Sequence, residues 1–152
     1  MATLERMFSV IVVGTDGSDT AAEAVSLAFE LARQNDATLH LVSAFRDPAS
    51  SMAVASAGAT AVADPSVTKA VLEDVSKRVL EEASALGEGV QVRTHAVSGP
   101  AADVILRVAE EVGADVVVVG SKGMRGAKRL IGSVPNTVAH RAPCHVLIAK
   151  TA

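Results

Sequence analysis

The segment Asp115-Val116-Val117-Val118-Val119-Gly120 constrains the fold of this chain more than any other part of the sequence. Four consecutive valines favour a strand, and because their side chains alternate between its two sides, both faces of that strand must be buried. Strands buried on both faces are typical of parallel sheets that carry helices on each side. The run therefore predicts a central strand in an α/β protein.

The rest of the chain alternates short β-branched runs with helical patterns, which is typical of a parallel sheet with helical crossovers. We expect strands over 8–13, 39–44, 90–97, 115–119 and 144–149, with the third at an edge. We expect helices from Ser18 to about Arg33, over a stretch marked by Val67, Val71, Leu72, Val75, Val79 and Leu86, from Pro100 to Gly113, and from Ser133 to about Arg141. Residues 47–65 show little pattern and predict a long loop. All of residues 1–152 fit a single domain.

Composition excludes several classes of function. The chain is 49% hydrophobic but has three Phe, no Trp and no Tyr, so its core must be aliphatic and it lacks aromatic platforms for stacking bases. A net charge of −3 does not suit a nucleic-acid-binding protein. No apolar run approaches the length of a membrane span, and we expect no signal peptide before the first strand. We therefore expect a cytoplasmic protein with neither nucleic acid nor membrane as partner, in which Cys144 is an inert packing residue.

Charge is unevenly distributed along the chain. No Asp or Glu follows Asp115, and the six Lys and Arg residues beyond it give that part +6. Since the whole chain carries −3, residues 1–115 sum to −9. A local cationic field on an acidic body suggests a site for a small anion.

A glycine-rich segment follows the valine strand and precedes a helix. Its backbone N–H groups can form an anion nest, and Ser133 stands where a helix N-terminus offers free N–H groups to a phosphate. The residues in and beside this segment that we expect to contact the bound nucleotide are Val119, Gly120, Ser121, Lys122, Gly123, Met124, Arg125, Gly126, Gly132, Ser133 and Val134. A P-loop is excluded because no Lys precedes Ser133.

A second loop, Gly14-Thr15-Asp16-Gly17-Ser18, follows the first strand. It lacks the Gly-x-Gly-x-x-Gly dinucleotide fingerprint, yet it lies at a strand's carboxyl end, where parallel sheets bind ligands. Asp16 has two interpretations, as a cap of the turn or as a ligand contact, and we favour the ligand contact. The four His residues show no metal-ligand spacing, so we expect no metal site and no catalytic residues.

The pattern Gly120-x-x-Gly123, eight residues, then Gly132-Ser133 resembles the ATP-binding signature of the universal stress protein family. Residues 12–18, 97–100, Val134 and 143–148 also agree with that family. The resemblance implies a five-stranded parallel sheet in order 3-2-1-4-5, a Rossmann-like fold of the adenine nucleotide alpha hydrolase type. It also implies a homodimer, formed through the last strand.

The resemblance further implies roles for individual residues. Asp16, beside Gly14 and Thr15, would contact the nucleoside, and the backbone of Ala44 would read the adenine edge. Gly120, Gly123, Gly132 and Ser133 would hold the phosphates of ATP, with Mg²⁺ as its accompanying ion. The family's usual spacing before the last glycine is nine residues, whereas this chain has eight. Cyclic AMP (cAMP) or AMP is therefore an alternative ligand.

The resulting hypothesis is an adenine-nucleotide-binding protein with a regulatory role in stress response. We expect at most slow ATP hydrolysis, because the loop offers neither a general base nor a P-loop lysine. Two alternatives stay open at this point. One is an adenylyl-transfer or ATP-pyrophosphatase-type enzyme on the same fold. The other is a scaffold that works through its dimer surface.

Overall fold

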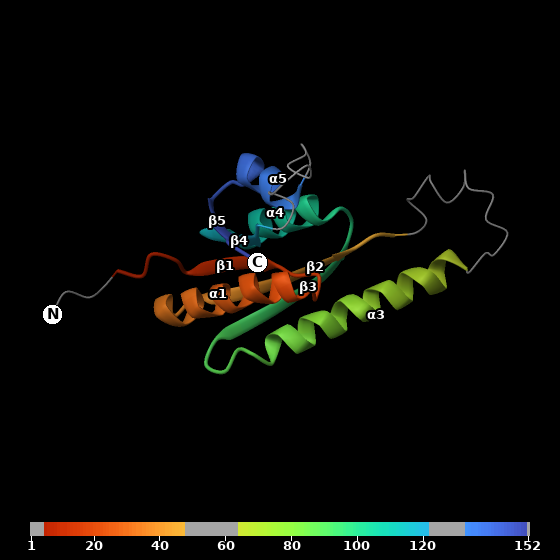
Figure 1. Ribbon diagram of the computed structural model, residues 1–152, viewed down its shortest axis with the longest axis horizontal. Coiled ribbons are helices and arrows are strands. Elements are labelled where there is room, and N and C mark those ends of the chain that lie inside the picture. The colour runs from red at the N-terminus through yellow and green to blue at the C-terminus, as the bar shows by residue number, and fades with distance from the viewer. Residues whose placement is uncertain (1–4, 48–63, 122–132, 152) are drawn as a thin grey trace.

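A five-stranded parallel sheet runs through the molecule in the order β3-β2-β1-β4-β5 (Figure 1). The computed structural model describes residues 5–47, 64–121 and 133–151. The strands are β1 (Val10–Gly14), β2 (Thr38–Phe45), β3 (Gln91–Ser98), β4 (Val116–Gly120) and β5 (His145–Ala149). All neighbouring strands pair in parallel. The strand order is the one that the family resemblance implies, and β3 lies at an edge as predicted.

Four helices cover the two faces of the sheet in the described part of the chain. Helices α1 (Asp19–Asn35) and α3 (Pro65–Ser84) lie on one face, and α4 (Ala101–Val112) and α5 (Val134–Arg141) lie on the other (Figure 1). None of the described helices is both long enough and apolar enough to cross a membrane. The sheet is thus enclosed from both sides, as the valine run predicts.

Local sequence signals set the helix ends. The hydroxyl of Ser18 accepts a hydrogen bond from the N–H of Ala21 (3.2 Å) and caps α1, and Gly113 closes α4. The carboxylate of Asp64 accepts from the N–H of Ser66 (2.9 Å) just before Pro65 opens α3. These starts agree with the sequence prediction, apart from α3, whose first residue, Pro65, falls within the predicted loop 47–65. Residues 48–63 of that loop lie outside the described residues.

The predicted strand bounds are wrong by one or two residues at several ends. Asp115 is the predicted first residue of the fourth strand, but it lies just before β4 and instead binds the start of β1. Its carboxylate accepts from the N–H groups of Ser9 and Val10 (2.7 and 2.9 Å), which satisfies donors at the start of β1. The strand β1 starts at Val10, which pairs with Thr38, rather than at Phe8.

Alternation along the strands divides the core into two clusters. In both β1 and β4, alternate residues belong to different clusters. Ile11 of β1 and Val118 of β4 pack with α1 and with Leu80 of α3. Val12 of β1 and Val117 and Val119 of β4 pack with α4 and with Val138 of α5. All four valines of β4 are at most 3% exposed. The prediction of burial on both faces is confirmed.

Helix α3 departs from the simplest interpretation of its valine pattern. Val67, Val71 and Val75 mark the helix correctly, but they are 58%, 57% and 50% exposed. The fully buried residues of α3 are Ser76 and Leu80 instead. The helix is therefore rotated so that most of its valines face away from the sheet.

Two polar pairs involve β2, one on each face of the sheet; the serine pair is buried and the histidine pair is partly buried. On the α3 face, the Ser76 hydroxyl lies 2.6 Å from the Ser43 hydroxyl. On the α4 face, His40 Nδ1 lies 2.8 Å from His95 Nε2, and the two rings stack with their centroids 5.1 Å apart. No buried side-chain nitrogen or oxygen among the described residues is left without a hydrogen-bond partner.

Candidate functional site

A pocket of about 460 Å³ opens at the carboxyl ends of the strands, where the strand order reverses between β1 and β4. This is the position at which doubly wound sheets bind ligands. Its wall is largely aliphatic, with hydroxyls and one carboxylate among the described residues. The lining residues are Gly14, Thr15, Asp16, Ser18, Thr20, Ala21, Val42, Ala44, Ala101, Ile105, Val119, Gly120, Ser133, Val134 and Pro135.

The turn between β1 and α1 forms one rim of the pocket and is held by its own side chains. The N–H of Ser18 donates to Asp16 Oδ1 (2.9 Å), and the N–H of Gly17 donates to Thr15 Oγ1 (3.2 Å). Asp16 thus does cap the turn, which was the first of its two interpretations. Because a carboxylate accepts several hydrogen bonds, this role leaves the exposed Asp16 able to accept ligand hydroxyls as well.

Helix α4 forms the opposite wall by approaching β1 closely. A Cβ atom at Gly14 would lie 2.6 Å from Ile105 Cδ1, so only glycine allows this contact without a shift. Ile105 is 4% exposed and lines the pocket together with Ala101 from the first turn of α4. Gly14 and Ile105 therefore pack closely against each other where they line the pocket.

The end of β2 presents backbone groups to the pocket. In a parallel ladder each residue directs its N–H and C=O toward the same neighbour, and the direction alternates along the strand. The C=O of Val42 accepts from the N–H of Thr15 (2.8 Å), so Val42 and also Ala44 face β1. β1 ends at Gly14, in register with Val42. One donor and one acceptor of Ala44 therefore face the space beyond β1.

The start of α5 closes the site on the side of β4. Ser133 is the N-cap, and its hydroxyl accepts from the N–H of Asn136 (3.4 Å). Its O–H proton remains available to donate to another acceptor. The first turn of α5 also supplies the positive end of a helix dipole at the pocket edge. The arrangement suits an anionic group next to Ser133.

The pocket brings together eight of the residues that the sequence predicts for binding. These are Gly14, Thr15, Asp16, Ala44, Val119, Gly120, Ser133 and Val134. Ser121 does not line it: its hydroxyl accepts from the N–H of Thr151 (3.0 Å) beside β5. Lys122, Gly123, Met124, Arg125, Gly126 and Gly132 lie outside the described residues.

Seven lining residues were missed by the sequence reasoning. Ser18 is the last residue of the loop after the first strand, and Thr20 and Ala21 follow that loop. Pro135 follows Val134, so extending each motif into its helix would have found the last three. Val42 precedes Ala44 on the same side of β2. Ala101 and Ile105 carry no motif, because they reach the pocket only through the packing of α4.

The surroundings of the described histidines and of the cysteine are set by pairing and burial. No cluster of three His, Cys, Asp or Glu side chains suited to a metal ion occurs in residues 5–47, 64–121 and 133–151. His40 and His95 pair with each other, and burial lowers the pKa of both. Burial raises the pKa of the Cys144 thiol, which agrees with an inert residue.

Fold and pocket together define a doubly wound α/β protein with a pocket at its topological switch point. Residues 7–150 match the family model described as the universal stress protein family. The chain is 33% identical to universal stress protein YxiE of Bacillus subtilis over 148 residues, covering 95% of this chain and 100% of that protein. It is 32% identical to universal stress protein Rv1636 of Mycobacterium tuberculosis, covering 95% and 97%. The chain therefore belongs to the universal stress protein family.

Solved structures agree with this assignment. A universal stress protein crystallised in complex with cAMP is 31% identical, with a TM-score of 0.72 and coverage of 95% of this chain and 98% of that chain. A universal stress protein from Archaeoglobus fulgidus in complex with dAMP shares the fold, with 24% identity, a TM-score of 0.62 and coverage of 93% and 98%.

Proposed function

We propose that the pocket binds an adenine nucleotide and that this binding gives the protein a regulatory role. The observation that carries the proposal is the convergence of Ala44, Asp16 and Ser133 on one aliphatic pocket. Each offers the type of group that one part of a nucleotide requires. The relative crystallised with cAMP supports the same class of ligand.

The base would lie against the aliphatic wall with its polar edge toward Ala44. The Watson–Crick edge of adenine offers an acceptor and a donor, which complement one backbone N–H and one C=O. A guanine edge offers a different pattern, with a carbonyl in place of the amino group. The backbone of Ala44 thus favours adenine.

The sugar would lie beside Asp16 and the phosphates beside Ser133. The Asp16 carboxylate would accept from ribose hydroxyls, and the Ser133 hydroxyl and the start of α5 would donate to phosphate oxygens. Gly120 and the residues from Lys122 to Gly132 would complete the phosphate site in this proposal. ATP, accompanied by Mg²⁺, is the ligand that we infer from the family signature. The cAMP complex of a relative makes cAMP its direct competitor, and AMP is the smaller alternative.

Calorimetric titration of the purified protein with ATP, ADP, AMP and cAMP tests the ligand. We expect saturable binding of at least one adenine nucleotide, with GTP at least tenfold weaker. Native mass spectrometry checks for a nucleotide that co-purifies. Failure to detect any adenine nucleotide by either method would contradict the proposal.

A matched pair of variants tests the phosphate end of the site. Asp and Asn are both good N-caps, so Ser133→Asp and Ser133→Asn should both retain α5. Only the aspartate adds a negative charge beside the phosphates. We expect Ser133→Asp to lower ATP affinity at least tenfold relative to Ser133→Asn. Equal affinities would mean that the phosphates lie elsewhere.

We also propose a homodimer through β5. This strand lies at the sheet edge, and His145 and Ala149 take part in the bonds to β4. By alternation, the N–H of Val146 faces outward. Val146→Pro should therefore keep the bonds to β4 and abolish pairing with a second β5, which light scattering after gel filtration would report as an assembly smaller than that of the parent protein.

A further inference from the structure

The outward side of α3 carries an apolar stripe that neither the core nor the pocket uses. Val67, Val71 and Val75 are at least half exposed, and no residue of α3 lines the pocket. Their spacing of four residues aligns them as one ridge along the helix. Beside this ridge runs a shallow hollow, whose lining includes the small residues Ser66 and Ala70. Ridge and hollow together form a surface that can pack against a copy of itself.

Two opposite charges frame this stripe symmetrically. Asp64 lies seven residues before Val71 and Arg78 lies seven residues after it. Seven residues advance an α-helix by about 10.5 Å and return to within about 20° of the same direction. Asp64 and Arg78 therefore share the face of Val71, at equal distances on either side.

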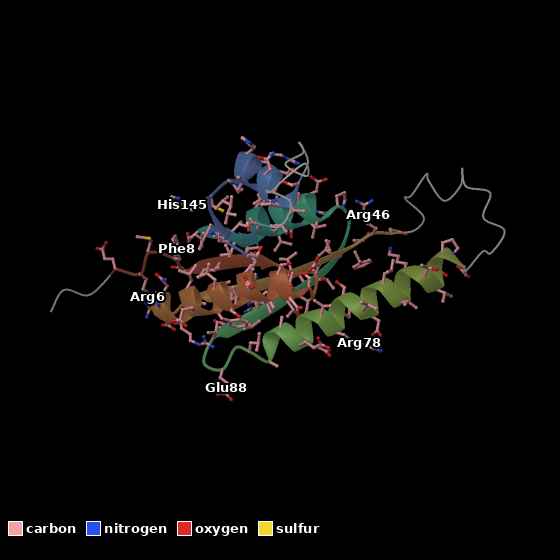
Figure 2. All side chains as sticks on the ribbon, in the orientation of Figure 1. Arg6, Phe8, Arg46, Arg78, Glu88 and His145 are labelled. Carbon is pink, nitrogen blue, oxygen red and sulfur yellow. The ribbon has the colours of Figure 1, made fainter. Side chains whose placement is uncertain are left out.

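Both charged side chains are exposed and held near the helix surface. Arg78 Nη2 lies 2.9 Å from Asp74 Oδ2, with 73% of its side chain exposed. Figure 2 shows Arg78 on the side of α3 that points away from the sheet. Asp64 is exposed and its Oδ1 accepts from the Ser66 hydroxyl (2.6 Å).

The charges select one occupant and one orientation. If two α3 helices cross in opposite directions about a two-fold axis at Val71, Arg78 of each copy lies level with Asp64 of the other. Val67 of each copy then meets Val75 of the other. Two parallel helices would instead place like charges together. An anionic membrane is disfavoured, because Asp64 and Asp74 flank the stripe.

We propose that α3 is an interface for a second copy of this chain, with the two helices antiparallel and Val71 on the symmetry axis. The contact is independent of nucleotide binding. It is also separate from β5, because α3 packs over β2 and β3 while β5 lies at the opposite edge of the sheet. The two interfaces are compatible, and together they would produce assemblies larger than a dimer.

Cysteine cross-linking tests the register directly. In a Cys144→Ala background, Val71→Cys should give a disulfide-linked dimer under mild oxidation, because the two Cα atoms come within disulfide range only at the axis. Val67→Cys and Val75→Cys should each give little dimer alone and a linked dimer when mixed. Leu27→Cys, an exposed residue of α1, is the control for random collision.

The proposal is overturned if Val71→Cys cross-links no better than Leu27→Cys, or if Val67→Cys alone cross-links as well as the mixture. A preference of the stripe for another protein or for vesicles over a second copy would equally overturn it.

Sedimentation of the variants provides a second, non-covalent readout. Val71→Glu places two carboxylates face to face at the axis and should weaken the α3 contact at least tenfold. Arg78→Asp should weaken it less. Both variants should keep the nucleotide affinity of the parent, so failure of this inference is distinguishable from failure of the proposed ligand. Unchanged self-association of Val71→Glu, or a parent protein with no α3-dependent association, would contradict the inference.

Discussion

Helices α3 and α4 pack on opposite faces of one sheet, and their apolar residues have opposite locations. Helix α4 buries Val104, Ile105 and Val108, and it forms a wall of the pocket. Helix α3 buries Ser76 and Leu80 and exposes most of its valines. A valine repeat thus identifies a helix without telling which side meets the sheet. The apolar stripe of α4 packs against the sheet, whereas the valine stripe of α3 is exposed and can contact another molecule.

Helices α3 and α4 also contact different glycines of the loop that follows β1. Ile105 of α4 contacts Gly14 at the floor of the pocket, whereas Val79 of α3 contacts Gly17 from outside the pocket. A Cβ atom at Gly17 would lie 2.9 Å from Val79 Cγ2. Helix α4 therefore shapes the site, and α3 supports the loop that carries Asp16.

The largest expected difference between the helices is in stability. Val108 is 3% exposed, so Val108→Asp buries a carboxylate and should cost several kcal/mol, enough to unfold much of the protein. Val71→Asp should change stability by only about 0.5 kcal/mol when measured at low protein concentration, where self-association does not contribute. Urea unfolding followed by circular dichroism measures both. Similar losses in the two variants would show that the outward side of α3 is buried.

The contact of α3 with the first loop can be isolated with two glycines. Gly17 and Gly89 have nearly the same φ, +79° and +80°, but a Cβ atom at Gly89 would meet nothing within 4 Å. Gly89→Ala should cost about 1 kcal/mol for the left-handed backbone, and Gly17→Ala about 1 to 2 kcal/mol more for crowding Val79. Val79→Ala should remove most of this difference. If the two glycine variants are equally stable, α3 does not constrain the loop.

Ligand affinity should respond to α4 and not to α3. Ala101→Glu extends a charged side chain into the pocket from the first turn of α4, where the helix itself tolerates a carboxylate. We expect it to weaken ATP binding at least tenfold, about 1.4 kcal/mol. Ala70→Glu makes the same change on the exposed side of α3 and should leave the affinity unchanged. Calorimetry compares them, and equal effects would contradict the location of the site.

The smallest expected effect is on the pH dependence of stability, which distinguishes the His40–His95 pair from the Ser43–Ser76 pair. Burial lowers the pKa of His40 and of His95 below the unfolded value near 6.5; the neighbouring His95 and then Arg93 lower His40 further, whereas Glu111 opposes the shift at His95. The unfolded chain then binds more protons as the pH falls below about 6.5, so stability is full above that pH and decreases on acidification. The slope is limited to about 1.4 kcal/mol per pH unit for each additional proton.

Two variants check this assignment. The double variant His40→Phe/His95→Phe should flatten the pH dependence of unfolding between pH 5 and 7. Ser76→Ala removes the hydroxyl pair on the α3 face, and it should lower stability by about 1 kcal/mol with the parent's pH dependence retained. An unaltered slope in the double His variant would assign the pH dependence to other groups.

Short-range signals in the sequence determined the elements of this protein. The four valines of β4 required burial on both faces, the side chains of Ser18 and Ser133 marked helix starts, and the alternation of strands and helices required parallel pairing. Because parallel strands align their carboxyl ends, Asp16, Gly120 and Ser133 were expected at one edge of the sheet, and the pocket there contains all three.

Tertiary structure alone decided which side of each helix is buried and which distant residues meet. Ala101 and Ile105 enter the pocket because α4 packs closely over Gly14, and no motif marks them. His40 and His95, which are 55 positions apart in the sequence, meet because the register of β2 and β3 places His95 opposite Val42, diagonally across from His40. The rotation of α3 depends on the surface offered by β2, β3 and Gly17. A local pattern encodes periodicity and caps, but packing is a property of two surfaces, and the second surface comes from another part of the chain.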